Sequence, residues 1–267
     1  MKELRMCLLV VMGLWFYSCS LPAQENDLTV NLEVGEFNTI EISNNFVATL
    51  EKSETFSVQI KIPSAVKDEL ETHISGKKIA VGFSCSFIEN RKRNKLMRHC
   101  KPVIRITAPS FENLELNGAV NLDLVGDFEM NDVFIKIGGA SNIYGDYLKA
   151  KNLKLYACGA SDVRMKLFAE NLKVKASGSS DVYLKPMSDK AGTSLILDIS
   201  GASDVIADEL PYESVVADLS GASDGKVYPL KKLRVDASGA SDLIYIKSST
   251  LRDKDLDSSG GSSIRSR

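Results

Sequence analysis

The sequence predicts an all-β fold, a β-helix or solenoid of about eight coils of ~20 residues each, preceded by an N-terminal β portion. Three observations predict it: a tetrad of Gly, Ala, Ser and Asp type recurs eight times, apolar residues alternate around it, and its last copy is the most degraded. The tetrads begin at Gly118, Gly139, Gly159, Gly178, Gly201, Gly221, Gly239 and Gly260. Their spacing of 18 to 23 residues indicates units that bury their apolar edges against their neighbours.

The alternation around each tetrad defines the repeated unit within residues 111–264. Leu153, Leu155 and Ala157 alternate with polar residues before the third glycine, and Val163 and Met165 do so after it. A period of two is typical of a strand with one buried face, so each unit is a strand, a tight corner and a second strand. This register predicts one buried row, formed by Leu155, Val174, Leu197, Ala217 and Val235.

The residue types of the tetrad suit a tight corner. Glycine tolerates positive φ, alanine and serine are small enough to pass over the coil below, and Asp or Asn can close an Asx-turn. Cys158, which stands just before the third glycine where other copies carry Ser, Asn or Gly, is predicted to be a buried small residue.

Residues 28–110 show less regular alternation. Strands are predicted at 37–42, 46–50, 56–62, 78–81 and 103–109, and this portion is expected to cover the first coil. A short helical turn is predicted from Ser64 to Leu70, with Ser64 as its N-cap.

The length and charge limit the function classes. A chain of 267 residues with 44% apolar content can bury a large core, and a formal net charge of −2 gives no basic excess for a nucleic-acid partner. The sequence does not indicate an oligomeric state.

The N-terminus predicts export. Basic residues precede an apolar run from Met6 to Tyr17, which is too short to span a membrane and typical of a signal peptide, here residues 1–23. Cleavage before Cys19 would make this cysteine a lipid acceptor, whereas cleavage after Ala23 would release a soluble protein. The third alternative is an uncleaved N-terminal anchor. The expected locations are the outer membrane as a lipoprotein, the cell surface or the periplasm.

An oxidising compartment makes Cys85 and Cys100 candidates for a disulfide, since they bracket a basic loop. The alternative is two independent buried thiols.

The repeated Ser-Gly-Ala-Ser-Asp units, the Ile-Thr-x-Pro segment at 106–109 and the Phe-x-x-Ile-x-Ile opening at Phe37 resemble a family of bacterial envelope proteins over about residues 37–247. It is the family described as putative auto-transporter adhesin, head GIN domain. The resemblance implies a single-stranded right-handed β-helix and an adhesin-like role, here as a lipid-anchored or exported module.

Motifs for catalysis are poorly supported. Gly221–Gly225 spells the G-x-S-x-G nucleophile elbow, but it is one copy of the structural repeat and has no histidine partner. His73 and His99 lie outside the repeats and have no metal-ligand spacing. The sequence therefore predicts no catalytic residues and a structural, binding or adhesin-like role. The alternative is a lyase or hydrolase acting on polysaccharide, a class to which many β-helices belong.

The corner carboxylates are the best candidates for specific chemistry. They are Asp162, Asp181, Asp204, Asp224 and Asp242. Stacked about 4.8 Å apart, each ionised pair costs about 0.9 kcal/mol even in water. Corner amides and serine hydroxyls are expected to relieve this repulsion, and bound Ca²⁺ is the alternative, since it prefers oxygen ligands. No other cofactor is expected.

A second column lies three residues before each glycine. Its members are Glu115, Lys136, Tyr156, Lys175, Asp198, Asp218 and Asp236. This face is mixed early and acidic late, which suits a glycan or an envelope protein as partner, although an ordinary solvated face is the alternative.

Overall fold

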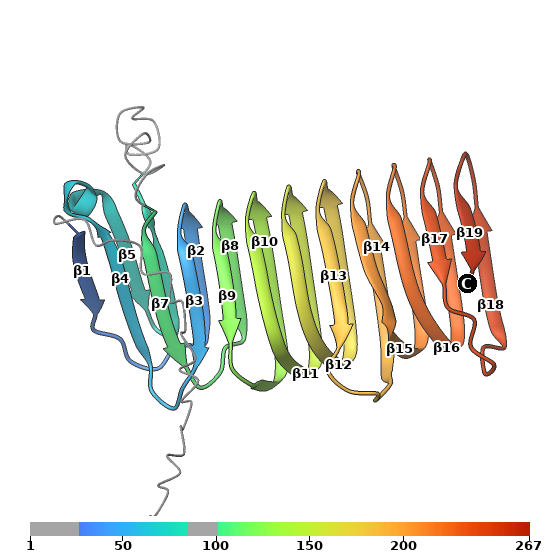
Figure 1. Cartoon of the computed structure of the whole chain (residues 1–267), viewed down its shortest axis with the longest axis horizontal. Coiled ribbons are helices and arrows are strands. Elements are labelled where there is room, and N and C mark those ends of the chain that lie inside the picture. The colour runs from blue at the N-terminus through green and yellow to red at the C-terminus, as the bar shows by residue number, and fades with distance from the viewer. Residues whose placement is uncertain (1–26, 85–100) are drawn as a thin grey trace, which may run out of the picture.

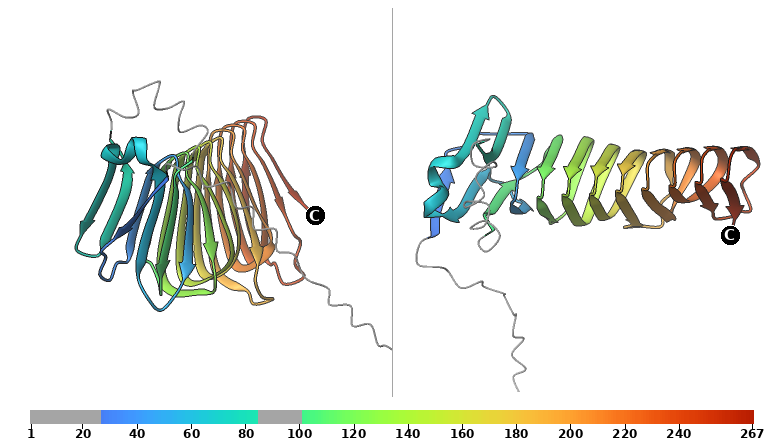
Figure 2. Two further views of the ribbon diagram at one scale, coloured as in Figure 1. Left: turned by 60° about the vertical axis from the view of Figure 1, so that its left-hand side comes forward. Right: turned by 90° about the horizontal axis from the view of Figure 1, so that it is seen from above.

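A computed structural model describes residues 27–84 and 101–267. It confirms the predicted fold: strands stack coil upon coil into a straight rod (Figure 1), which is broadest at its N-terminal end (Figure 2). In the described part of the chain, no helix is long and apolar enough to cross a membrane. The predicted signal peptide with Cys19, and the Cys85 and Cys100 pair, lie outside the described residues.

The described residues before the repeats form seven strands and one short 3₁₀ helix: β1 (Asp27–Leu32), β2 (Thr39–Asn44), β3 (Val47–Lys52), β4 (Ser57–Pro63), η1 (Ser64–Glu69), β5 (Leu70–Ser75), β6 (Lys78–Phe83) and β7 (Val103–Ala108). The repeats contain β8 (Asn113–Gly118), β9 (Asn121–Val125), β10 (Phe128–Gly139), β11 (Asn142–Gly159), β12 (Asp162–Gly178), β13 (Asp181–Pro186), β14 (Gly192–Ile199), β15 (Asp204–Leu219), β16 (Asp224–Ala237), β17 (Asp242–Tyr245), β18 (Asp253–Ser258) and β19 (Ser263–Ser266).

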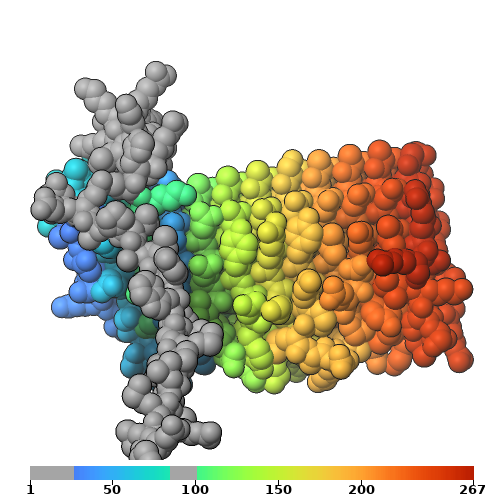
Figure 3. All heavy atoms as spheres, viewed as in Figure 1, coloured from blue at the N-terminus to red at the C-terminus, as the bar shows by residue number. Residues whose placement is uncertain are grey.

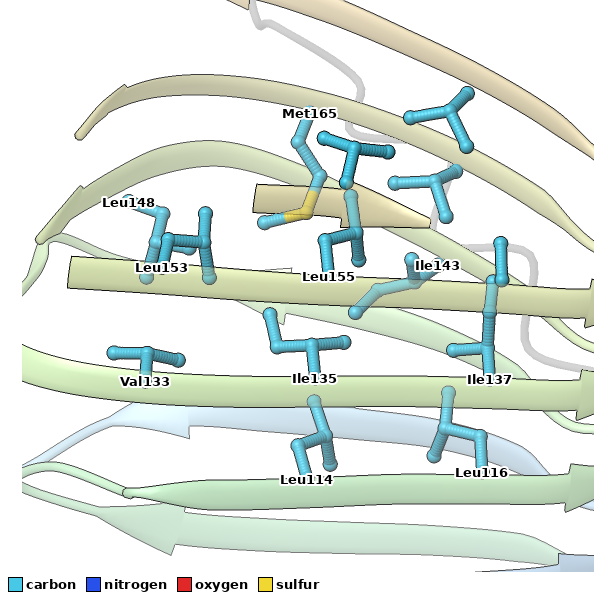
Figure 4. Packing of buried hydrophobic residues seen from close by; sticks show 14 of the residues in the cluster. Leu114, Leu116, Val133, Ile135, Ile137, Ile143, Leu148, Leu153, Leu155 and Met165 are labelled. Carbon is cyan, nitrogen blue, oxygen red and sulfur yellow. The ribbon is translucent and has the colours of Figure 1, made fainter. Parts of the chain in front are cut away.

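Successive coils pair in parallel and in register, so that like positions stack. The predicted buried row is confirmed: Leu155 pairs with Val174, and the row continues through Leu197, Ala217 and Val235, each at most 1% exposed. Figure 4 shows its extension toward the N-terminus through Ile135 and Leu114. The core is therefore a set of apolar columns enclosed between the two strand layers of each coil.

The eight corner glycines form one column along the rod. All have positive φ, between 72° and 107°. A Cβ on Gly201 would lie 2.5 Å from the carbonyl oxygen of Gly178 in the preceding coil. The residue after each corner glycine donates its backbone amide to the carbonyl of the corner residue in the preceding coil. The Ala202 amide, for example, donates to the Gly178 carbonyl at 2.8 Å. Both the backbone angle and the close stacking thus require glycine.

The third tetrad residue points inward. Six serines at this position are fully buried: Ser141, Ser161, Ser180, Ser203, Ser223 and Ser241. The Ser180 hydroxyl, for example, donates to the carbonyl of Ser177 at 3.0 Å, three residues back. These hydroxyls therefore satisfy buried backbone acceptors, which would be costly to leave unpaired.

The N-terminal portion lies over the first tetrad coil and supplies a coil of its own. Strands β2 and β3 pair with β8 and β9, and Asn44 takes the corner position with φ 77°. Strands β6 and β7 extend the two layers in parallel, and β5, β4 and β1 then add antiparallel strands that close this end. Strands β1, β4, β5, β6 and β7, together with η1, thus form a cap on the rod.

Two local predictions are wrong. The predicted helical turn forms as η1, but Pro63 rather than Ser64 occupies its N-cap position, and no side chain bonds to its first amides. Cys158 is exposed rather than buried, because the strand alternation directs Ala157 inward and its neighbour outward. The Cys158 thiol donates to the carbonyl of Ile137 at 3.4 Å.

Candidate functional site

The five corner aspartates lie in one column, which we call the acidic column. Register pairs join Asp162 to Asp181, then Asp204, Asp224 and Asp242. Amides occupy the same position in the two preceding coils, where Asn142 donates its side-chain amide to the Asn121 oxygen at 2.7 Å. This corner position is therefore occupied first by two asparagines, which hydrogen-bond to each other, and then by the five carboxylates of the acidic column.

The C-terminal end of the acidic column has a donor and a cation beside it, whereas burial and repulsion prevail at its centre. At the C-terminal end, the Ser263 hydroxyl donates to Asp242 at 2.6 Å and the Arg265 guanidinium lies 3.7 Å from the same carboxylate. In the centre, burial raises the pKa of Asp204, and the charges of Asp224 and Asp181 raise it further. A hydrogen bond from the Asp224 backbone lowers the pKa of Asp204, but the net shift remains upward.

The contacts of the corner serines and of Asp204 bear on the expected relief of the repulsion. The buried corner serines, such as Ser180 and Ser223, donate their hydroxyls to carbonyls inside the rod rather than to the carboxylates. Ser263, which stands at the aspartate position of the last coil, donates to Asp242. Corner amides do not offset burial and repulsion at Asp204. Among the residues that the structure describes, no group of three or more His, Cys, Asp or Glu side chains is arranged to hold a metal ion.

Beside the acidic column runs an outward row that we call the tyrosine–arginine stripe, consisting of Tyr144, Arg164 and Tyr183 on β11, β12 and β13. The three are register neighbours on successive coils. The Arg164 guanidinium lies 5.5 Å from the centre of the Tyr183 ring, a cation–π distance, and Tyr144 is 38% exposed. The stripe thus presents two aromatic rings and a cation on a rigid sheet.

A groove of about 350 Å³ borders the stripe on the side away from the acidic column. Its lining includes Asp146, Lys166 and Lys185, together with Arg164 and Tyr183 of the stripe. We call the register pair Lys166 and Lys185 the lysine edge. Each lysine has a carboxylate nearby. The Lys166 ammonium lies 3.3 Å from the Asp146 carboxylate, and the Lys185 ammonium lies 3.8 Å from the carboxylate of a glutamate of β15.

An irregularity in β11 borders this groove. The pairing of β11 with β12 shifts between Gly145 and Leu148, so the chain bulges there. Gly145 itself occupies an inward position, where a Cβ would lie 3.3 Å from the Leu124 side chain. Bulges are common next to functional sites, where they redirect side chains.

The opposite layer carries the second predicted column, and its charges and rings mostly contact one another. Lys175 bonds to Asp198 at 2.6 Å and lies 5.9 Å from the Tyr156 ring centre. Tyr156 also packs edge-on against Phe134 at 5.1 Å. The acidic continuation is in register through Asp218, Asp236 and Asp257. The aromatic rings and cations of this face are thus already partnered, and its later part is a row of carboxylates.

Two features bear on catalysis. Ser223, the serine of the elbow-like motif, is fully buried and donates its hydroxyl to Ser220 at 3.1 Å, so it does not present a nucleophile. Each coil turns a second time at the end opposite the tetrad corner, and we call this turn the second bend. Glu129 and Glu170 share a hollow of about 400 Å³ there. Lys149, 2.8 Å away, lowers the pKa of Glu129. A general acid needs the opposite shift.

The matched family model decides the classification. Residues 36–249 match the model described as putative auto-transporter adhesin, head GIN domain. The chain belongs to this family. A search of the curated proteins finds no match.

Solved structures support the fold. A putative adhesin from Parabacteroides merdae has a TM-score of 0.76 at 14% identity, over 91% of this chain and 97% of that one. A putative lipid binding protein from Parabacteroides distasonis has a TM-score of 0.75 at 14% identity over the same shares. A putative adhesin from Bacteroides fragilis has a TM-score of 0.63 at 18% identity, over 91% of this chain and 98% of that one.

The sequence predictions singled out the acidic column but not the stripe. Tyr144, Arg164 and Tyr183 each stand five residues after a corner glycine, so their side-by-side placement follows from the repeat. Comparing that position across coils would have found them.

Proposed function

We propose that this family member is an exported, lipid-anchored and non-catalytic binding module of the bacterial envelope, with an adhesin-like role. The observation that carries the proposal is the tyrosine–arginine stripe, where an exposed tyrosine and a cation–π pair lie on stacked strands. Exposed aromatic and arginine side chains on a rigid element are typical of binding surfaces, because little side-chain entropy is lost on contact. The family description supports an envelope location.

The lipid anchor is tested separately. If Cys19 carries the lipid, Cys19→Ala moves the protein from the membrane fraction to the soluble fraction of cells that express the full chain. An intact mass equal to that of an unmodified chain beginning at Gln24 would contradict the anchor and support soluble export.

Binding through the stripe is tested with the mature protein on intact cell envelopes and on a glycan array. Tyr144→Ala combined with Tyr183→Ala should abolish binding, because both stacking surfaces are lost. Tyr156→Ala, an aromatic truncation on the opposite layer, is the matched control and should bind like the unaltered protein. Equal loss in the control and the double variant would refute the role of the stripe.

A polysaccharide-acting enzyme is the second candidate, favoured only by the two glutamates in the hollow at the second bend. Release of reducing ends or unsaturated products from a polysaccharide panel, lost in Glu170→Gln, would support it over the binding module.

A further inference from the structure

We propose that the tyrosine–arginine stripe and its groove bind an anionic saccharide, with the carboxylate or sulfate of a sugar held at the lysine edge. The proposal rests on the binding function above and adds the class of ligand.

Three parallel columns give the surface a chemical polarity. Carboxylates of the acidic column, such as Asp162 and Asp181, lie two positions toward the corner from the stripe, and the lysine edge lies two positions away on the other side. Carboxylates accept hydrogen bonds from hydroxyl groups, aromatic rings contact apolar C–H faces, and lysines donate to anions. A pyranose ring carries all three features: hydroxyls, an apolar face and, in acidic sugars, an anionic substituent.

The charges that line the groove favour an anion. Arg164, Lys166 and Lys185 are cations, and Asp146 is the single carboxylate among the lining residues. Within the described residues, no carboxylate forms an ion pair with Arg164, which instead stacks on Tyr183. The side chains of the Lys166–Asp146 pair are 53% and 90% exposed. Such exposed pairs contribute little, so a ligand anion can replace Asp146 as the partner of Lys166.

The shape of the site fits a saccharide segment. A volume of about 350 Å³ is at the lower end of the range for small-ligand sites, which is about 300–1,000 Å³. The site is an open groove on a sheet face, and coils continue beyond it through Ile206 and Lys226 in the same column as Tyr183. Figure 3 shows side chains of successive coils as continuous rows along the rod. A linear saccharide can therefore extend along the rod from the groove.

The experiment compares acidic glycans with their neutralised counterparts. An array carries uronate, sialate and sulfate glycans, each printed beside its carboxyl-reduced or desulfated form, and the mature protein is the probe. We expect binding to the acidic form to be about tenfold tighter or more, the scale of a charge-assisted hydrogen bond. Comparison of the uronate, sialate and sulfate glycans shows which anionic group the protein recognises.

The variants separate this inference from the proposed function. Lys166→Gln combined with Lys185→Gln removes both cations of the lysine edge and should remove the preference for the acidic member of each pair, while weak binding through the tyrosines remains. Lys232→Gln, on the opposite layer, is the matched control and should keep the preference. Equal binding to acidic and neutralised glycans, a preference that survives in the double variant, or no glycan binding at all would overturn the inference. The binding function would fall only if intact envelopes were also not bound through the tyrosines.

Discussion

Replacing Asp204 by Asn removes the central charge of the acidic column and should stabilise the protein at neutral pH. Asp204 has Asp181 and Asp224 as register neighbours. At about 4.8 Å each neighbour contributes about 0.9 kcal/mol of repulsion at the dielectric of water. Screening with a Debye length of about 8 Å reduces the total to about 1 kcal/mol. An asparagine fits the position, since Asn142 already holds it.

The pH dependence of this gain has a definite sign. The folded-state pKa of Asp204 is raised above its ordinary value of 3.8, so the folded state binds more protons than the unfolded state between the two values. Stability therefore falls as the pH rises through that window, and the penalty is complete at neutral pH. Below the unfolded pKa both states are protonated. The advantage of Asp204→Asn should be present at pH 7 and absent near pH 3.

Thermal unfolding followed by circular dichroism measures the effect. We expect the Tm of Asp204→Asn to rise by about 2–4 °C at pH 7. A variant with a lower Tm at pH 7 would refute the reasoning, because it would mean that backbone amides or a cation stabilise the ionised carboxylate.

Three other predictions follow from the stacking. Gly201→Ala should destabilise by at least about 1–3 kcal/mol from its positive φ alone, measured by urea unfolding, whereas Gly35→Ala, where a Cβ would meet nothing within 4 Å, should change little. Val174→Asp should prevent folding of the mature protein, because it buries an unpaired charge between coils, and an unchanged circular dichroism spectrum and Tm would contradict the buried row. Excess Ca²⁺ and excess chelator should give the same Tm, and a rise with calcium that Asp224→Asn removes would disprove this.

The sequence allowed the coil, the corner and the buried row to be predicted because each depends on local periodicity. Val174 and Leu197 occupy equivalent places relative to their glycines, so their stacking follows from the repeat. The coil at Asn44 was missed because its corner lacks both the glycine and the serine of the tetrad, and because the cap separates it from β8.

The state of the acidic column could not be fixed from sequence. Register predicted that the carboxylates stack, but the pKa of Asp204 depends on its burial and on the balance between the charges of Asp224 and Asp181 and an opposing backbone hydrogen bond. The stripe was missed for a different reason. Tyr144 and Tyr183 are distant in the chain, and a single tyrosine between polar residues gives no signal until the coils are aligned.

The two ends of the rod differ in how they should open. The cap strands close the N-terminal end, whereas, among the described residues, β18 and β19 pair along one side only and β18 is exposed throughout. Since each coil pairs only with the coils before and after it, opening of the last coil leaves the previous one as the new end. Amide hydrogen exchange should accordingly be fastest in β18 and β19 and slow progressively toward β11 and β12. The tyrosine–arginine stripe, on β11 to β13, thus lies in the part of the rod that is expected to remain ordered longest.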